Sequence, residues 1–583
     1  MMKILFRSIR EYKKQSLQAP ILVALEVVME VVIPLLMANL IDFGIEKGDM
    51  GYIWKMGLGL LVAALLSLFF GIAAGKAAAY ASAGFAKNLR QDMYYNVQNF
   101  SFANIDKFST SSLVTRLTTD VTNVQNAYQM VIRMAIRSPF MLIFSLFCAF
   151  QVDAELSLIF VGSIPILGIG LYLIMTRVHP IFKRVFKTYD KLNNVVQENL
   201  HGIRVVKSFV REDYEREKFG KISTQIYEDF SKAEKMLAFN MPLMQFCVYA
   251  CLLLLSWFGA KAIVACGGDP ATGLSTGELM SLITYTMQIL MSLMMLSMVF
   301  VMIVMSKASA ERIAEVLTEE SSLKNGENPV MEVPDGSIEF EHVSFAYSEK
   351  AHKKCLDDID LKIASGETIG IIGGTGSSKS TLVQLIPRLY DVTEGDLKVG
   401  GRDVRDYDLE TLRDNVAMVL QKNELFSGTI KENLRWGNEH ATDEELIHAC
   451  KLAQADDFVS AFPDGYDTYI EQGGTNVSGG QKQRLCIARA LLKKPKILIL
   501  DDSTSAVDTK TDAMIRKAFL EEIPDTTKII IAQRVSSVQD ADRIVVLDDG
   551  KISGIGTHEE LLRDNEIYRE VYESQQKGGG KDE

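Results

Sequence analysis

The chain has 583 residues, of which 48% are hydrophobic and 23% are charged, and its formal net charge is −12. This length exceeds what one hydrophobic core usually supports, so we expect at least two domains. The acidic balance argues against a general nucleic-acid binder. A mean hydropathy of +0.10 is high for a soluble enzyme, yet the fraction of charged residues is too high for a chain lying wholly in lipid. A membrane half joined to a soluble half reconciles these values.

The first half of the chain is dominated by long apolar stretches. Its basic start precedes an apolar run too long for the core of a signal peptide, so we interpret this run as a membrane span. Six stretches approach the roughly 20 apolar residues that cross a bilayer: 18–41, 53–75, 134–152, 156–176, 243–265 and 279–305. The short links between them are mostly acidic and the long links are rich in Lys and Arg. The positive-inside rule then predicts a multi-pass protein of the cell (inner) membrane with both termini in the cytoplasm.

Two long links between spans are almost free of turn residues. From Phe85 to Ser138 there is neither Gly nor Pro, and 177–240 contains only Pro180, Gly202 and Gly220. Helices that continue out of the membrane explain this, and about 25 residues each way would extend roughly 35 to 40 Å. We therefore predict stalks with a hairpin at each tip, near 104–111 and 209–214. The alternative is a pair of separate soluble inserts.

The second half has a different pattern. A charged helical stretch from Ala308 to Glu320 leads into a Gly/Pro/Asn-bearing segment, and we assign 307–336 as a linker after a transmembrane domain at 1–306. Short β-rich runs then alternate with helical patterns, which predicts an α/β domain with a largely parallel sheet at 337–575. The runs are "SIEFEHVSF", "TIGIIG", "VAMVL", "ILIL", "KIIIA" and "RIVVL". We expect 576–583 to be a disordered tail.

A glycine-rich loop follows one of these strands, in "TIGIIGGTGSSKSTL". The segment fits the phosphate-loop pattern G-x-x-x-x-G-K-[ST], except that Ser378 stands at the second glycine. Such a loop turns backbone amides towards phosphate oxygens, its lysine reaches the β- and γ-phosphates, and its hydroxyl ligates Mg²⁺. The predicted nucleotide contacts are Gly373, Gly374, Thr375, Gly376, Ser377, Ser378, Lys379, Ser380 and Thr381. A Gly/Ser loop with a surface lysine is the alternative.

Other segments supply the groups that a nucleotide site needs. "ILILDD" is a buried strand that ends in Asp501, which is placed to hold Mg²⁺. "NVSGGQKQR" opens a helix with small residues and offers a second seat for an anion. With Gln421 in "VAMVLQKNELF" and Tyr347 in "VSFAYSE", these segments are similar to the ATP-binding cassette, in the order in which that family carries them.

The resemblance covers essentially the whole chain. Six spans ahead of one cassette resemble a multidrug-type ABC exporter half-transporter with an α/β P-loop (RecA-like) domain. It implies ATP and Mg²⁺ as cofactors, and a second half-transporter subunit whose cassette closes head to tail on this one. Tyr347 would stack the base. Ser380, Gln421 and Asp501 would hold Mg²⁺, while Ser478, Gly479, Gly480 and Gln481 would face the partner's ATP. The two hairpin tips resemble the helices that seat on the cassettes.

Three positions depart from the family pattern. Asp502 stands where a glutamate polarises the attacking water, and Gln533 in "IIIAQRVSS" stands where a histidine contacts the γ-phosphate. Aspartate is one methylene shorter, and glutamine cannot take up a proton at neutral pH. Ser378 adds a side chain where the loop usually has none. The "SAVD" loop, ending at Asp508, is intact.

These departures predict a heterodimer in which this chain's site binds ATP and hydrolyses it slowly, while its intact partner-facing residues complete a competent site on the other subunit. A homodimer with two slow sites is one alternative, including a homodimeric lipid flippase. An ATP-gated channel or a regulatory subunit is another.

The spans give two indications about cargo. Met287, Met291, Met294, Met298, Met302 and Met305 recur every three or four residues, so they share one helical face. Methionine suits a surface that accepts many apolar shapes, although helix packing or lipid contact is equally compatible. Glu26 and Glu30 share a face of the first span and could contact cationic cargo, or bond to a neighbouring helix. We expect a small hydrophobic or cationic substrate, a lipid bilayer and no nucleic acid.

Overall fold

The computed structural model describes residues 2–266, 273–348, 353–503 and 506–579. The chain divides into two compact units. Unit 1 comprises Met1–Gln98 and Ser109–Glu319, and unit 2 comprises Asn99–Phe108 and Glu320–Glu583. Part of the third short link between spans, and the end of the expected tail, lie outside the described residues.

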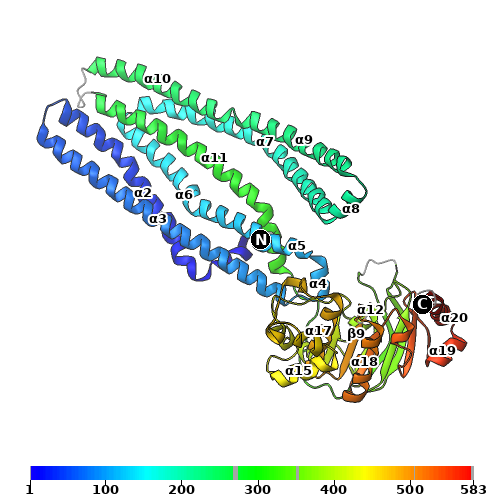
Figure 1. The fold of residues 1–583 in the computed structure, drawn as a ribbon. Helices are drawn as coiled ribbons and strands as arrows, with labels where there is room; N and C mark the ends of the chain where they lie inside the picture. The colour runs from blue at the N-terminus through cyan, green and yellow to red at the C-terminus, as the bar shows by residue number, and fades with distance from the viewer. Residues whose placement is uncertain (1, 267–272, 349–352, 504–505, 580–583) are drawn as a thin grey trace. The chain divides into compact units, whose positions relative to one another are not determined.

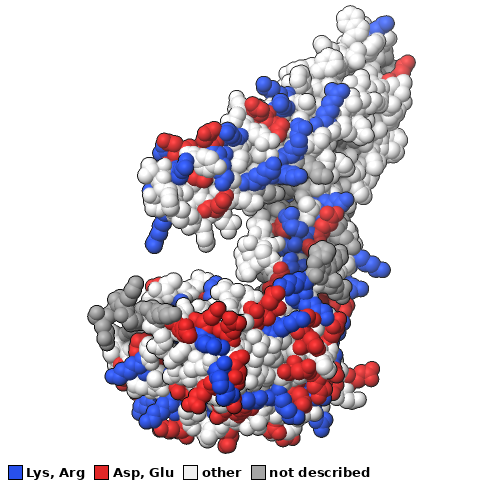
Figure 2. Space-filling view, turned by 90° about the vertical axis from the view of Figure 1, so that its right-hand side faces the viewer, with Lys and Arg blue, Asp and Glu red and all other residues white. Residues whose placement is uncertain are grey.

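Unit 1 is helical throughout its regular elements. Six helical segments are long and apolar enough to cross a membrane, and each contains one of the predicted spans, which are confirmed. In the face shown in Figure 2, charged side chains are dense over unit 2, whereas one end of unit 1 is almost free of them. The elements are α1 (Met2–Leu5), η1 (Phe6–Tyr12), α2 (Lys13–Asn39), η2 (Leu40–Ile45), α3 (Met50–Gln98), α5 (Thr110–Thr115), η3 (Arg116–Asp120), α6 (Val121–Val152), α7 (Ala154–His201), α8 (Ile203–Ser208), α9 (Glu212–Leu237), α10 (Asn240–Cys266) and α11 (Thr276–Thr318).

The long links are continuations of the spanning helices. α3 runs unbroken from Met50 to Gln98 and α7 from Ala154 to His201, as the scarcity of turn residues predicts (Figure 1). In the second hairpin, α7 ends at His201, the short helix α8 covers Ile203–Ser208, and α9 begins at Glu212, so the turn between α8 and α9 begins at Phe209. The charged stretch after Ser306 is the end of α11, not a separate helix.

Buried polar contacts join the helices of unit 1. α2 packs along α3 and α6, α6 packs along α11, and α7 packs along α9 and α10. Asp42 accepts hydrogen bonds from the Ser275 hydroxyl at 2.5 Å and the Gly277 amide at 2.8 Å, at the start of α11. Asp120 accepts from Ser309 Oγ at 2.8 Å and Arg312 Nε at 2.7 Å, near the other end of α11. These contacts fix α11 along its length.

Unit 2 is an α/β fold. Its strands are β1 (Ile338–Phe345), β2 (Leu356–Ile363), β3 (Thr368–Gly373), β4 (Glu394–Val399), β5 (Arg402–Asp403), β6 (Val416–Val419), β7 (Gly428–Thr429), β8 (Tyr469–Ile470), β9 (Ile497–Asp501), β10 (Thr527–Ile531), β11 (Arg543–Asp548) and β12 (Lys551–Gly556). Its helices are α4 (Phe102–Lys107), α12 (Lys379–Leu385), α13 (Leu409–Asn415), α14 (Ile430–Arg435), α15 (Asp443–Leu452), α16 (Asp456–Ser460), η4 (Gly465–Asp467), η5 (Gln472–Gly474), α17 (Gly479–Leu492), α18 (Thr509–Glu522), η6 (Val535–Ser537), α19 (His558–Asp564) and α20 (Glu566–Gly579).

The main sheet has the order β12-β11-β3-β10-β9-β6. All its neighbours pair in parallel except β12, which confirms the largely parallel sheet. "SIEFEHVSF" is an exception to the prediction, because β1 belongs to a separate antiparallel sheet of order β2-β1-β4-β5. The pairing of β1 with β2 has two register shifts, which interrupt the regular alternation of inward and outward side chains along β1. The sequence pattern therefore did not indicate the sheet to which β1 belongs.

The parallel strands are apolar on both faces because each face is covered. In β9, Ile497 and Ile499 enter one hydrophobic core while Leu498 and Leu500 enter another. Because alternate residues of β9 are buried in two different cores, the strand is apolar at every position before Asp501. β3 and β9 flank β10 in parallel, so the loop after β3 and the carboxylates after β9 emerge at the same edge.

A short helix from the first hairpin belongs to unit 2. α4 lies within the predicted tip region, and Asn104 Nδ2 donates to the Glu320 carbonyl at 3.0 Å. Ser101 Oγ lies 2.7 Å from Ser322 Oγ, and Tyr390 donates its hydroxyl to Asp106 Oδ2 at 2.7 Å. α4 is therefore held both by the segment that follows α11 and by the α/β fold.

Candidate functional site

The glycine-rich loop connects β3 to α12, and its backbone conformation requires small residues at defined positions. A Cβ on Gly373 would lie 2.1 Å from the Leu547 carbonyl oxygen, so no side chain fits there. Gly376 has φ +87°, in the left-handed region. Ser378 also lies in that region, with φ 68° and ψ 25°, although it is not glycine. The departure at Ser378 therefore carries strain of about 1 kcal/mol.

Lys379 opens α12 and reaches back over the loop. Its ammonium donates to the Gly373 carbonyl at 2.9 Å, to the Gly374 carbonyl at 2.8 Å and to Ser377 Oγ at 3.2 Å. Burial lowers the pKa of Lys379, while the nearby carboxylates of Asp501 and Asp502 oppose that effect. The cation thus lies between the loop and the acidic end of β9.

Two predicted magnesium ligands meet in the structure. Ser380 donates its hydroxyl to Asp501 Oδ1 at 3.0 Å, and Asp501 is only 3% exposed. Burial raises the pKa of the Asp501 carboxyl, with the Ser380 hydrogen bond acting the other way. A hydroxyl and a buried carboxylate that converge are the hard oxygen donors that Mg²⁺ prefers, so the residues present fit the ion. Gln421, two residues beyond β6, is exposed, and the described residues show no hydrogen bond between it and Asp501.

The two residues at the catalytic positions contact each other. Gln533 Nε2 donates to Asp502 Oδ2 at 2.8 Å. They emerge from neighbouring parallel strands, since Gln533 follows β10 and Asp502 follows β9. Asp502 has φ 48°, an uncommon conformation for a non-glycine residue. One oxygen of the Asp502 carboxylate is therefore engaged by an amide that cannot accept a proton.

Tyr347 lies beside the start of α12. Its hydroxyl is 3.0 Å from Thr381 Oγ1, and its ring meets Tyr390 edge-on with centroids 5.2 Å apart. The Tyr347 side chain is 52% exposed, which leaves ring surface for stacking a base. Tyr390 in turn contacts Asp106 of α4. Sequence reasoning missed this role of Tyr390, because a tyrosine paired with a distant aspartate forms no local motif.

The small residues at the start of α17 let the backbone around Ala506 pack closely against this helix. Ser478 and Gln481 cap the helix reciprocally: Ser478 Oγ accepts from the Gln481 amide and Gln481 Oε1 accepts from the Ser478 amide. A Cβ on Gly480 would lie 2.8 Å from the Ala506 carbonyl oxygen, and Gln483 Oε1 accepts from the Ala506 amide at 3.0 Å. The first residue of the predicted "SAVD" loop, Ser505, lies outside the described residues.

Among the described residues, no hydrogen bond joins Ser478, Gly479, Gly480 or Gln481 to the segment 373–381. Within the described part of the chain, the two surfaces between which the nucleotide is predicted to lie are therefore not joined by a hydrogen bond.

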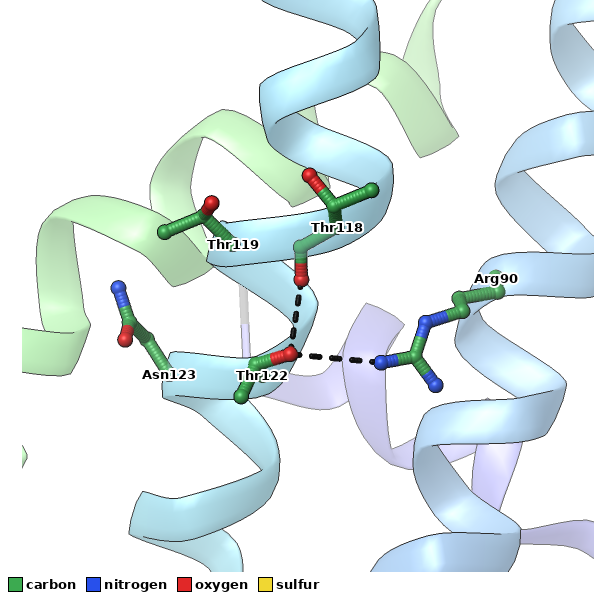
Figure 3. Close-up of a pocket in the computed structure, with 5 residues that line it drawn as sticks. All are labelled: Arg90, Thr118, Thr119, Thr122 and Asn123. Atoms are coloured by element: carbon green, nitrogen blue, oxygen red, sulfur yellow. Dashed lines mark hydrogen bonds between the residues drawn. The ribbon is translucent and has the colours of Figure 1, made fainter.

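Unit 1 carries a separate polar hollow of about 380 Å³ between α3 and the start of α6 (Figure 3). Arg90 donates to Thr122 Oγ1 at 3.4 Å, and Thr122 donates to the Thr118 carbonyl at 2.9 Å. Thr119 and Asn123 complete the lining. The hollow contains none of the predicted nucleotide residues.

The two span carboxylates have a partner on a neighbouring helix. Arg137 of α6 donates to Glu26 Oε1 at 2.5 Å and to both oxygens of Glu30 at 2.7 Å. A Cβ on Gly71 of α3 would lie 3.0 Å from Glu26 Oε1, so glycine leaves room for this side chain. The structure thus shows the interhelical contact, one of the two alternatives for these residues.

Comparison with known proteins agrees with this arrangement. The family model of the ABC transporter transmembrane region matches residues 17–293, and the family model described as ABC transporter matches residues 356–505. The chain is 38% identical to the uncharacterised ABC transporter ATP-binding protein YfiB of Bacillus subtilis over 557 residues, covering 96% of each. It is 33% identical to the ATP-dependent lipid A-core flippase of Desulfotalea psychrophila over 494 residues, covering 84% of each.

Among solved structures, a bacterial Atm1-family ABC exporter with ATP bound has the same fold, with a TM-score of 0.82, 23% identity, and coverage of 97% of this chain and 99% of that one. The chain therefore belongs to the ABC transporter family: it is a multi-pass membrane protein with the exporter fold, in which an ATPase domain coupled to transport is fused to the transmembrane region.

Proposed function

We propose that this chain is the degenerate-site subunit of a heterodimeric exporter that moves hydrophobic or amphipathic compounds across the cell membrane by alternating access. Its own site binds ATP tightly and hydrolyses it slowly. Its α17 completes a second, competent site on the partner subunit. Both termini and unit 2 lie in the cytoplasm.

The observation that carries this proposal is the hydrogen bond from Gln533 to Asp502, at 2.8 Å. A general base must be free to accept a proton and must reach the attacking water. Asp502 ends about 1.5 Å short of a glutamate, by one carbon–carbon bond. Its partner is an amide in place of an imidazole, and an amide does not take up a proton near neutral pH.

The groups that bind the nucleotide are retained. Lys379 and the loop amides would hold the phosphates, Tyr347 would stack the base, and Ser380 with Asp501 would hold Mg²⁺, which screens phosphate charge when bound. The site can therefore bind and close while hydrolysis is impaired. In this proposal a second subunit supplies the surface that closes on the nucleotide; in support, no hydrogen bond among the described residues joins the start of α17 to the phosphate loop.

The cargo follows from the spans. On the methionine face of α11, Met287, Met291, Met298 and Met305 are each at least 45% exposed, whereas Met294 and Met302 are half-buried. Soft, adaptable side chains on an open helix face suit varied apolar shapes. Glu26 and Glu30 both form ion pairs with Arg137. We therefore assign the hydrophobic character of the cargo to the methionines and assign no cation site to the glutamates.

A second candidate is a lipid flippase. It is favoured by the 33% identity to the lipid A-core flippase, which covers both the membrane and ATP-binding regions. In that case the methionine face would accommodate acyl chains, and the assembly would be a homodimer with two slow sites.

The test combines purification and transport. The chain purified alone should hydrolyse ATP only slowly, and robust turnover that Asp502→Asn abolishes would refute the degenerate-site assignment. Co-expressed with a second half-transporter and placed in vesicles, it should accumulate an apolar dye against its gradient when ATP is supplied. Passive dye flux after ATP binding would indicate a channel, and movement of labelled lipid between leaflets without dye uptake would indicate the flippase.

A further inference from the structure

The C-terminal helix α20 reaches the loop that carries Gln533. Tyr568 of α20 is fully buried, and its hydroxyl lies 2.7 Å from His558 Nδ1, so the first turns of the helix are fixed to the body of unit 2. Farther along α20, Gln575 Nε2 donates to the Gln533 carbonyl at 2.7 Å. Gln575 Oε1 accepts from the Val535 amide at 2.9 Å.

These two hydrogen bonds hold a short segment that the sheet does not hold. β10 ends at Ile531, and the Ala532 amide still donates to the Ile371 carbonyl of β3. Beyond it, neither the Gln533 carbonyl nor the Val535 amide takes part in a backbone hydrogen bond among the described residues. One side-chain amide therefore supplies both a donor and an acceptor, as a neighbouring strand would.

The consequence reaches the carboxylate. With its backbone fixed by Gln575, Gln533 directs its side chain to Asp502 Oδ2. Gln533 is itself exposed, so burial does not restrict its rotamers. Gln575 of α20 is thus connected through Gln533 to the carboxylate of Asp502, which lies next to the predicted magnesium ligand Asp501.

We propose that Gln575 is a positioning residue for this chain's nucleotide site: by holding the backbone on both sides of the Gln533–Val535 segment, it keeps the Gln533 side chain on Asp502, and so sets how long the closed site retains ATP. The inference rests on the proposed function, since it concerns retention at a slowly hydrolysing site. It makes the docking of α20 a determinant of nucleotide release.

The test uses the full-length complex and photoreactive azido-ATP labelled at the α-phosphate. The complex is loaded with the probe and chased with unlabelled ATP. Samples are crosslinked at intervals, and the label on this chain is resolved by gel. Gln575→Leu removes both hydrogen bonds at nearly constant size. Gln575→Glu keeps the acceptor for the Val535 amide but loses the donor to the Gln533 carbonyl. Gln576→Leu, an exposed neighbour on α20, is the matched control.

We expect Gln575→Leu to speed release of label from this chain about three- to tenfold, the effect of one or two net hydrogen bonds, with Gln576→Leu unchanged. Gln533→Ala should have a similar effect, and the double variant Gln533→Ala with Gln575→Leu should be no faster than either single one. Gln575→Glu should be fast at pH 7.5 and slow towards the wild-type rate only as the pH falls to about 4.3, the ordinary pKa of glutamate, because a protonated glutamate regains the donor. Gln575→Leu should not show that recovery.

Additive effects of the two substitutions, or equal release from wild type and Gln575→Leu, would overturn the proposal. So would a Gln575→Glu profile parallel to that of Gln575→Leu, since a structural role alone has no reason to recover on protonation. Failure of the proposed function is recognised separately, by a fall in γ-phosphate label relative to α-phosphate label on the wild-type chain. Release of intact ATP removes both labels equally, so this ratio reports hydrolysis and does not depend on the release rates of the variants.

Discussion

Restoring the two altered residues, Asp502→Glu together with Gln533→His, should convert this chain's slow site into a hydrolysing one. The longer side chain moves the carboxylate forward by about 1.5 Å, towards the position of the attacking water. The imidazole can accept or donate a proton near neutral pH, which the amide cannot. The double change also removes the 2.8 Å hydrogen bond that engages Asp502 Oδ2.

The expected magnitude follows from what a general base is worth. Positioned acid–base groups contribute about 10²- to 10⁴-fold, or roughly 3 to 5 kcal/mol of barrier. The hydrogen bond from the Gln533 amide to the charged Asp502 carboxylate is worth roughly 1.5 to 3 kcal/mol, and the double variant no longer has to release it. The double variant should therefore gain at least about 10²-fold in turnover. Asp502→Glu alone should gain less, because Gln533 remains and can hydrogen-bond the longer carboxylate.

The assay is phosphate release by the chain purified alone, where every site carries the same residues. Both variants and wild type are compared at saturating MgATP, with Lys379→Ala as the background. The reasoning is refuted if the double variant binds ATP normally and its turnover stays at the wild-type level. It is also refuted if wild type already turns over at the rate of the double variant.

Three further changes test the site and the spans. Ser378→Gly should raise the melting temperature of unit 2 by roughly 2 to 4 °C, because glycine adopts φ 68° without the strain of about 1 kcal/mol; an unchanged or lower value in thermal unfolding without nucleotide contradicts this. Asp501→Asn should raise the nucleotide-free melting temperature at neutral pH, because burial raises the pKa of Asp501 and so disfavours its charged form in the fold. The same change should abolish the further rise in melting temperature with MgATP. A variant that still responds to Mg²⁺ would exclude Asp501 as a ligand. Arg137→Met should destabilise unit 1 by about 3 to 5 kcal/mol, because two carboxylates lose their cation, and adding Glu26→Gln and Glu30→Gln should restore folded yield in detergent; equal yields for all three forms would show that the contact is unimportant.

The spans and the phosphate loop were predictable because their information is local. Twenty apolar residues in a row, or a strand followed by glycines and a lysine, can be recognised without knowing any other part of the chain. The continuous stalks followed from the scarcity of Gly and Pro between Phe85 and Ser138.

Contacts between distant segments were not predictable in the same way. The positions of Asp502 and Gln533 could be recognised from the resemblance, but their hydrogen bond depends on β9 and β10 being neighbours in register. Gln575 carries no local pattern that would connect it to Gln533. The assignment of α4 to unit 2 depends on Asn104 and Tyr390, which lie far apart in sequence. Such pairings are properties of the folded chain and not of any one segment.

The central claim is that ATP stays unhydrolysed on this chain while the complex turns over. It is tested most directly by loading the complex with azido-ATP labelled at either the α- or the γ-phosphate, crosslinking during steady-state hydrolysis, and measuring the ratio of γ- to α-label on this chain. The account predicts a ratio that stays near that of intact ATP through many turnovers of the complex. A ratio that falls on this chain as fast as phosphate is released into solution would contradict it.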